Sequence, residues 1–342
     1  MSNTRAESST AAFSASKSNV GMVHVPDKRL YELEKRQPTR KIVHTTVEFV
    51  DIPGLARGAG GGGGSKFLAD IRNTDALIHV LRCFDDDNLP HIEGKVDPVR
   101  DMETVELELQ VRDLESVEKK IEKTARLLKT GDKQAGKIIE VLEKYKRHLE
   151  SFHPVRTMET EEQDRQHVAD LMLLSAKPVI YVCNVDESSA LQGNKYSEQV
   201  EKTLGGQDAE MITVAAGVEA EIAELDNQED RLAFLEDAGL GEPGVNRLIR
   251  SAYRLLQLNT FFTVGPKEIR AWTITRGMNA PQSAGVIHSD LERGFIRAEV
   301  IKYDDFISLG SESACRDKGK LSIEGRNYIV EDGDILNIRF NV

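Results

Sequence analysis

Short apolar runs alternate with polar stretches along much of the chain. The runs of strand length are Val20–Val25, Val47–Ile52, Ala76–Leu81, Val179–Cys183 and, less clearly, Met211–Val214. Apolar runs of this length are typical of strands that are buried on both faces of a parallel sheet. Helical or looped stretches separate them, so the pattern predicts an α/β fold with helices packed on the sheet.

The stretch Glu103–Phe152 has a helical period instead. One apolar seam consists of Leu107, Val111, Leu114, Val117, Ile121, Ala125 and Leu128, and a second of Ala135, Ile138, Leu142, Tyr145, Leu149 and Phe152. Thr130-Gly131-Asp132 separates the two seams. The three- and four-residue steps predict a helical hairpin. Its many Glu and Lys side chains are typical of solvated outer faces.

The C-terminal part of the chain changes character again. Strand-like runs occur at Arg270–Ile274, Ile296–Ile301, Tyr328–Val330 and Ile335–Phe340. Turn signals such as Arg276-Gly277 and Asp332-Gly333-Asp334 separate them. The pattern predicts a small, separate β-rich domain.

Composition narrows the class of protein. The chain has 342 residues and a formal net charge of −12, which argues against nonspecific coating of nucleic acid but permits RNA contact through a local basic patch. Its three cysteines show neither zinc-ligand spacing nor a disulfide framework, which favours a reducing, cytoplasmic location. Cys83 and Cys183 each follow an apolar run and are expected to be buried thiols.

The N-terminal residues 1–18 are rich in Ser, Ala and Thr. They lack the apolar core of a secretory signal, so we expect a disordered leader, with a transit peptide as the alternative. The chain has no apolar run near the roughly 20 residues that span a bilayer, so no membrane partner is expected.

A D-x-x-G motif follows the second apolar run, at Asp51-Ile52-Pro53-Gly54. In switch NTPases this Asp holds a magnesium-bound water and the Gly amide meets the γ-phosphate. Asp51 and Gly54 are therefore candidate phosphate-site residues, with no direct metal ligand predicted. The alternative is an ordinary Pro-Gly turn after a strand.

A candidate base-binding motif follows the fourth run, where Asn184-Val185-Asp186-Glu187 reads N-x-x-E. Guanine-specific enzymes have N-K-x-D at this place, so a Glu in place of the Asp changes the base that is read. Ala215 and Ala216 follow the next strand and could approach the base through their backbone. The alternatives are an Asn/Asp turn and small residues that end a strand.

The phosphate-binding string G-x-x-x-x-G-K-[ST] does not occur in residues 1–342. That string supplies backbone amides, a phosphate-binding Lys and a magnesium-binding hydroxyl. The segment from Gly58 to Lys66 resembles it but has Ser before Lys and follows the wrong strand, so we interpret it as a flexible linker.

From about residue 19 onward the chain resembles the YchF / Obg-like ATPase family. The matching segments are Asn19–Val23, Val25–Asp27, Phe49–Leu55, Lys66–Arg72, Gly94–Pro98, Glu242–Asn246 and Val286–Ile296. The resemblance implies a P-loop G domain (19–102 and 171–258), a coiled-coil insertion (103–170) and a C-terminal β-grasp-like TGS domain (259–342). It also implies ATP preferred over GTP, Mg²⁺, and binding to the ribosome, chiefly to its large subunit.

The resemblance assigns roles to individual residues. Asn184 and Glu187 would meet the adenine, with Asp186, Ala215 and Ala216 beside it, and Asp51 and Gly54 would face the γ-phosphate and magnesium. The family's candidate catalytic His falls on His91, where an imidazole on a mobile loop could position water. The alternative for His91 is an ordinary surface residue.

The chain departs from the family at its N-terminal end. The family opens with a strand and a P-loop, and neither is present before Asn19. Its switch I has a magnesium-binding Thr where this chain has Ala15, within Ala12–Asn19. Two hypotheses follow: a ribosome-binding ATPase, or a binding module that docks on the ribosome or RNA without hydrolysing nucleotide.

Overall fold

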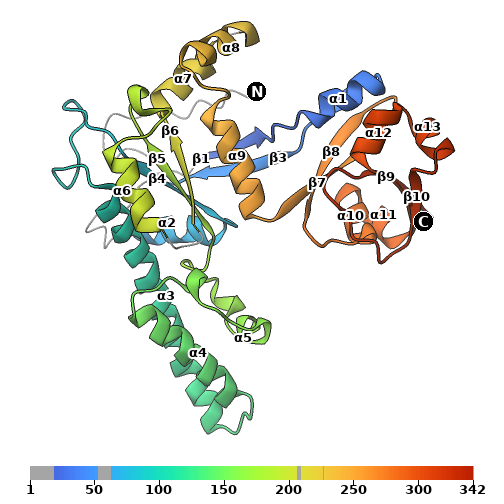
Figure 1. The fold of residues 1–342 in the computed structure, drawn as a ribbon. Helices are drawn as coiled ribbons and strands as arrows, with labels where there is room; N and C mark the ends of the chain where they lie inside the picture. The colour runs from blue at the N-terminus through green and yellow to red at the C-terminus, as the bar shows by residue number, and fades with distance from the viewer. Residues whose placement is uncertain (1–18, 53–62, 206–208, 226, 342) are drawn as a thin grey trace. The chain divides into compact units, whose positions relative to one another are not determined.

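The computed structural model describes residues 19–52, 63–205, 209–225 and 227–341 (Figure 1). The predictions for residues 1–18 and for Gly54 lie outside these ranges. The described residues divide into two compact units. One combines Gly21–Phe49 with residues 248–341, and the other contains Val50–Arg247.

The unit Val50–Arg247 contains a parallel sheet of β4 (Leu77–Arg82), β5 (Val179–Asn184) and β6 (Glu210–Val214), in the order β4-β5-β6. Every residue of β5 from Val179 to Cys183 is buried, as its uninterrupted apolar run predicts. The helices of this unit outside the hairpin are α2 (Gly63–Arg72), α5 (Glu162–Gln166), α6 (Lys195–Leu204), α7 (Ala216–Glu224) and α8 (Gln228–Asp237). The predicted α/β class is confirmed.

The five predicted strands are all present, but they are divided between two sheets. β1 (Asn19–His24) and β3 (Thr46–Asp51) form a two-stranded sheet of their own. β4 has a hydrogen-bonded neighbour on one side, β5, and its Val80 side chain is 60% exposed. A strand with one unpaired side leaves a row of backbone N–H and C=O groups without ladder partners. Both sheets therefore have open edges among the described strands.

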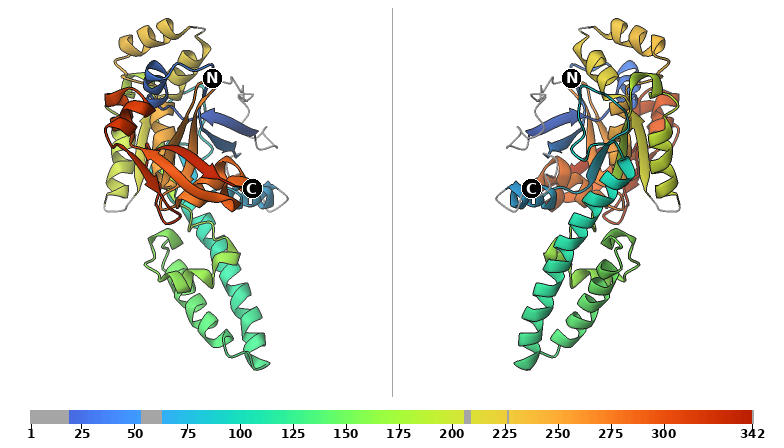
Figure 2. Two further views of the ribbon diagram at one scale, coloured as in Figure 1. Left: turned by 90° about the vertical axis from the view of Figure 1, so that its right-hand side faces the viewer. Right: turned by 90° about the vertical axis from the view of Figure 1, so that its left-hand side faces the viewer.

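The predicted hairpin is confirmed as α3 (Pro98–Lys129) and α4 (Ala135–Glu150), which run side by side in both views of Figure 2. Gly131 has φ +96° at the turn, a conformation that favours glycine. In the second seam Ala135, Leu142, Tyr145 and Leu149 are buried and Ile138 is half-buried, whereas Phe152 is 73% exposed, so its inclusion in the seam was wrong.

The base of the hairpin is held by a buried carboxylate that the sequence pattern did not identify. Asp113 lies in α3 and accepts hydrogen bonds from the Leu174 N–H (2.7 Å), the Ser175 N–H (2.7 Å) and the Ser175 hydroxyl (2.6 Å). Burial raises the pKa of the Asp113 carboxyl. In the first half of α3 the buried face differs from the predicted first seam. Leu109 and Asp113 are buried there, while the seam residues Leu107 and Val111 are exposed.

The other unit is built on a six-stranded sheet with the order β10-β9-β11-β7-β8-β2. Its strands are β2 (Ile42–Val43), β7 (Leu258–Val264), β8 (Ile269–Thr275), β9 (Phe295–Ile301), β10 (Leu321–Glu324) and β11 (Ile335–Phe340). Three of the four predicted strand runs in this region are present as β8, β9 and β11. The run Tyr328–Val330 forms a single bridge, between Ile329 and Asn279, so its prediction as a strand was wrong.

Helices cover both faces of this sheet. α1 (Arg29–Arg36), α12 (Tyr303–Leu309) and α13 (Glu312–Asp317) pack on one face, and α10 (Ala280–Ile287) and α11 (Ser289–Arg293) on the other. α9 (Gly244–Leu255) precedes β7 and begins in the other unit. Neighbouring residues Phe261 and Phe262 on β7 belong to two different buried clusters, because successive side chains of a strand point to opposite faces.

The segment Gly21–Phe49 packs with the C-terminal region, whereas the resemblance assigns it to the G domain. Leu30 and Leu33 of α1 are fully buried in the same cluster as Phe306 and Ile335. β2 then pairs with β8 in parallel. The apolar face of α1 is buried against this sheet, and that burial accounts for the grouping.

Candidate nucleotide-binding site

The loops that follow β4, β5 and β6 meet at the carboxyl end of the parallel sheet. The Cys83 N–H donates to the Asn184 carbonyl (2.8 Å), and the Val185 N–H donates to the Val214 carbonyl (2.9 Å). This edge is where open α/β sheets bind ligands. The N-x-x-E segment follows β5 and Ala215-Ala216 follows β6, so both lie at this edge of the sheet, as the sequence predicts.

Asn184 joins two of these loops through its side chain. Its Oδ1 atom accepts a hydrogen bond from the Ala216 N–H (3.0 Å), at the first residue of α7. Ala215 precedes the helix and is 5% exposed, so a larger side chain would not fit there without rearrangement. The structure thus brings Asn184, Ala215 and Ala216 together, as the motif spacing predicts.

Asp186 has a structural role in its own loop. Its carboxylate accepts hydrogen bonds from the Ser188 hydroxyl and from the Ser189 N–H (3.1 Å), and it caps the short helix Glu187–Ser189. These hydrogen bonds, that from Ser188 first, lower the pKa of the Asp186 carboxyl. The bonds support the Asn/Asp turn that was the alternative interpretation, and direct contact between Asp186 and a nucleotide stays a prediction.

Glu187 differs from Asp186 because its side chain is exposed. Among the residues that the structure describes, none donates a hydrogen bond to the Glu187 carboxylate or pairs with it. The carboxylate is therefore available to accept from a ligand. Glu187 lies three residues after Asn184, and its carboxylate has the chemistry to accept from the exocyclic amino group of a base. The assignment of that base as adenine stays a prediction.

His91 is held more firmly than a mobile loop would imply. Its Nδ1 atom accepts from the Glu93 N–H (3.1 Å), and its Nε2 atom lies 2.9 Å from Oδ2 of Asp101, at the start of α3. The His91 side chain is 13% exposed. Both ring nitrogens are thus engaged, and His91 would have to leave Asp101 before it could orient a water.

Asp51 is exposed at the end of β3, as expected for the Asp of D-x-x-G. Gly54 is outside the described residues, so the motif is seen only in part. Cys83 and Cys183 are both fully buried, which confirms the expectation of strand-end thiols.

Asn194 is a contributor that the sequence motifs did not identify. Its side chain donates to the Cys83 carbonyl (2.8 Å) and caps α6 by accepting from the Ser197 N–H (3.2 Å). The available signal was the helix-start pattern Asn194-x-x-Ser197, which predicts a cap but not the bond to the end of β4. Asn194 therefore fixes the loop after β4 against the helix that follows Glu187.

Comparisons with known proteins agree with this fold. The family model YchF-GTPase_C, described as "Protein of unknown function (DUF933)", matches residues 258–341. The "Ribosome-binding ATPase YchF" of Bacillus subtilis is 46% identical over 341 residues, covering 98% of this chain and 93% of that protein. The protein of the same name from Escherichia coli O157:H7 is 43% identical over 338 residues, with the same coverage. The chain belongs to the YchF family.

A solved structure extends the match to three dimensions. The YchF GTPase of Schizosaccharomyces pombe superposes with a TM-score of 0.86 at 32% identity, covering 94% of this chain and 87% of that one. The resemblance drawn from the sequence motifs is therefore confirmed. No helix among the described residues is long and apolar enough to cross a membrane.

Proposed function

We propose that this chain is a cytoplasmic ribosome-binding protein of the YchF family that retains an adenine-binding loop. The observation that carries the proposal is the length of the match. Relatives named ribosome-binding ATPases align over 98% of the chain, so the match extends through both the hairpin and the C-terminal domain. The resemblance places the contact chiefly on the large subunit.

The basic residues available for docking are local. The segment Lys28–Lys41 has six basic and two acidic side chains, and the C-terminal domain adds Arg316, Lys318 and Lys320. Three of these cations have acidic partners, since Arg29 contacts Asp27 (2.8 Å), Arg316 contacts Glu312 (3.0 Å) and Lys320 contacts Asp305 (3.1 Å). The segment around α1 therefore has the larger surplus of positive charge.

The chain is expected to cosediment with ribosomes at low salt, with or without ATP. Binding should weaken steeply at moderate salt, because each phosphate that a Lys or Arg neutralises releases counterions. Failure to pellet with ribosomes at low salt would contradict the docking proposal. Strict dependence on ATP would instead show that the nucleotide site controls docking.

The nucleotide preference rests on Asn184 and Glu187. A Glu carboxylate extends one methylene beyond the usual Asp and cannot read guanine in the same geometry. We expect unlabelled ATP to displace labelled ATP better than GTP does. Glu187→Ala should reduce this preference, whereas Glu198→Ala, an exposed carboxylate on α6, should leave it unchanged. Stronger displacement by GTP would overturn the assignment.

A non-hydrolysing binding module is the second candidate function, and one sequence observation favours it. The residues offer the adenine half of ATP the Glu187 carboxylate and the side-chain amide of Asn184, which the Ala216 N–H holds in place. They do not fit the triphosphate and Mg²⁺ half. The string G-x-x-x-x-G-K-[ST], which supplies a phosphate-binding Lys and a magnesium-binding hydroxyl, is absent from residues 1–342. Asp51 could reach Mg²⁺ only through water, so this candidate function is binding without hydrolysis.

A further inference from the structure

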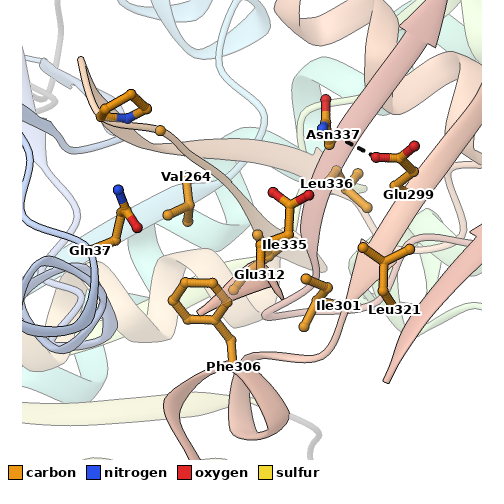
Figure 3. Close-up of a pocket in the computed structure, with 12 residues that line it drawn as sticks. Gln37, Val264, Glu299, Ile301, Phe306, Glu312, Leu321, Ile335, Leu336 and Asn337 are labelled. Atoms are coloured by element: carbon orange, nitrogen blue, oxygen red, sulfur yellow. Dashed lines mark hydrogen bonds between the residues drawn. The ribbon is translucent and has the colours of Figure 1, made fainter. Parts of the chain in front are cut away.

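A cavity of about 130 Å³ lies within the unit that contains the C-terminal domain (Figure 3). We call it the C-terminal cavity. Its apolar floor is formed by Ile301, Phe306, Leu321 and Ile335. An apolar cavity of about 150 Å³ admits benzene, so the space is on the scale of one six-membered ring. The cavity thus offers an apolar surface for a single flat ring system.

Polar groups gather at one edge of the C-terminal cavity, where Figure 3 shows Glu299, Glu312 and Asn337. Glu299 is 8% exposed and accepts from Arg339 Nε (3.2 Å), Arg339 Nη2 (3.1 Å) and Asn337 Nδ2 (3.3 Å). The hydrogen bonds from Arg339 lower the pKa of the Glu299 carboxyl, so it stays ionised.

The amide of Gln37, which follows α1, lies across the cavity from Glu299 (Figure 3). Carboxylate oxygens accept from exocyclic amino groups, and side-chain amides both donate and accept. These are the groups that read base edges in nucleic-acid complexes. The C-terminal cavity therefore combines an apolar floor with the hydrogen-bonding groups that a base requires.

Cations flank the C-terminal cavity on two sides. Arg316 and Arg339 stand beside Glu312 and Glu299 and are 58% and 51% exposed. On the other side, exposed Arg36 directly precedes the lining residue Gln37, and exposed Lys267 directly follows the lining residue Pro266. Two cations thus contact the two carboxylates, and two more are chain neighbours of lining residues, in a chain whose net charge is −12.

We propose that the C-terminal cavity takes one unpaired nucleobase of a single-stranded RNA segment, whose flanking phosphates lie on Arg36, Lys267 and Arg316. The proposal rests on the proposed ribosome binding and names the RNA feature that is bound. The cations on the two sides of the cavity could contact the phosphates before and after the bound base of a single RNA strand. Single-stranded RNA can present an unstacked base in this way, whereas a paired helix cannot.

The test uses the full chain and a short single-stranded RNA with one 2-aminopurine. Binding is followed by anisotropy, and burial of the base by its protection from acrylamide quenching. We expect protection on binding and much weaker binding of the same sequence as a duplex. The double variant Gln37→Ala/Glu312→Ala should lose the protection and bind about tenfold more weakly, the scale of one good base contact.

Charge variants separate the phosphates from the base. Lys267→Ala should reduce the slope of log K against log salt by about 0.7, the value for one phosphate contact on a single strand. Arg276→Ala removes one cation at the opposite end of β8 and should leave that slope unchanged. Glu324→Gln changes a carboxylate on β10 next to Ile323, the partner of Glu299, and should keep the base protected. Thermal unfolding followed by circular dichroism checks that each variant folds.

The outcomes are distinguishable from those of the ribosome experiment. An unprotected base, equal affinity for duplex RNA, or equal affinity for a free ribonucleotide would overturn the cavity assignment even if the chain cosediments with ribosomes. A protected base in the RNA without cosedimentation would support the C-terminal cavity as an RNA site and contradict ribosome docking.

Discussion

A protein made of residues 1–342 should release phosphate from ATP roughly 10²–10³-fold more slowly than the Bacillus subtilis relative, because even one lost group that stabilises transition-state charge can cost this much. The missing P-loop string removes several such groups: a nest of backbone amides, a Lys and a magnesium-binding hydroxyl. The measurement is phosphate release with and without Mg²⁺, at equal protein concentrations.

A gain-of-function variant makes the same prediction sharper. A strand and P-loop of the kind that the family resemblance implies would replace residues 1–18, and hydrolysis should rise toward the rate of the Bacillus relative. The matched control carries the same segment with its P-loop Lys changed to Ala, and it should stay slow. If the unaltered chain already hydrolyses ATP at the relative's rate, the prediction is wrong.

Backbone amides of β3 should exchange with solvent at least about 100-fold faster than those of β9, a difference of about 3 kcal/mol in opening free energy. β3 pairs with β1 in a sheet of two strands, and such a pair is marginal by itself. β9 lies between β10 and β11, and its residues Ala298–Ile301 are all buried. Hydrogen exchange followed by mass spectrometry measures both strands in one experiment.

β5 provides the internal control for this exchange measurement. It lies between β4 and β6 and is buried from Val179 to Cys183, so it should exchange slowly although it belongs to the other unit from β9. Equal protection of β3 and β9 would contradict the prediction. It would mean that a further segment, such as residues 1–18, or a rearranged sheet pairs with the β1–β3 strands.

Local periodicity was sufficient to predict the strands of the first part of the chain and the hairpin. The five strand-like runs of the first part of the chain became β1, β3, β4, β5 and β6. The helical hairpin also appeared where its seams predicted it. Each of these signals depends on the spacing of apolar residues within one segment, which the sequence contains completely.

The pairing of elements could not be predicted in the same way. β2 is two residues long and has no periodic signal, yet it joins α1 to the C-terminal sheet through β8. The C-terminal cavity brings Gln37 together with Asn337, which are far apart in the chain. Such contacts depend on tertiary packing, which overrides local preference.

The candidate site shows the same division. Motif spacing identified Asn184 and Ala216 as neighbours, and the hydrogen bond between them agrees. It did not show that Asp186 caps its own turn or that His91 is tied to Asp101, because both contacts depend on loop geometry. Sequence motifs therefore located the site more reliably than they assigned the role of each side chain.

Equilibrium binding of ATP and AMP to the full chain, in the presence of Mg²⁺, tests the central claim most directly. The claim is that residues 1–342 contain the adenine-binding loop but no phosphate-binding loop. The account predicts that the two nucleotides bind within about threefold of each other, a difference of less than about 1 kcal/mol, because the outer phosphates gain few contacts. Binding of ATP about 100-fold or more tighter than AMP would contradict it, since the triphosphate would then contribute about 3 kcal/mol.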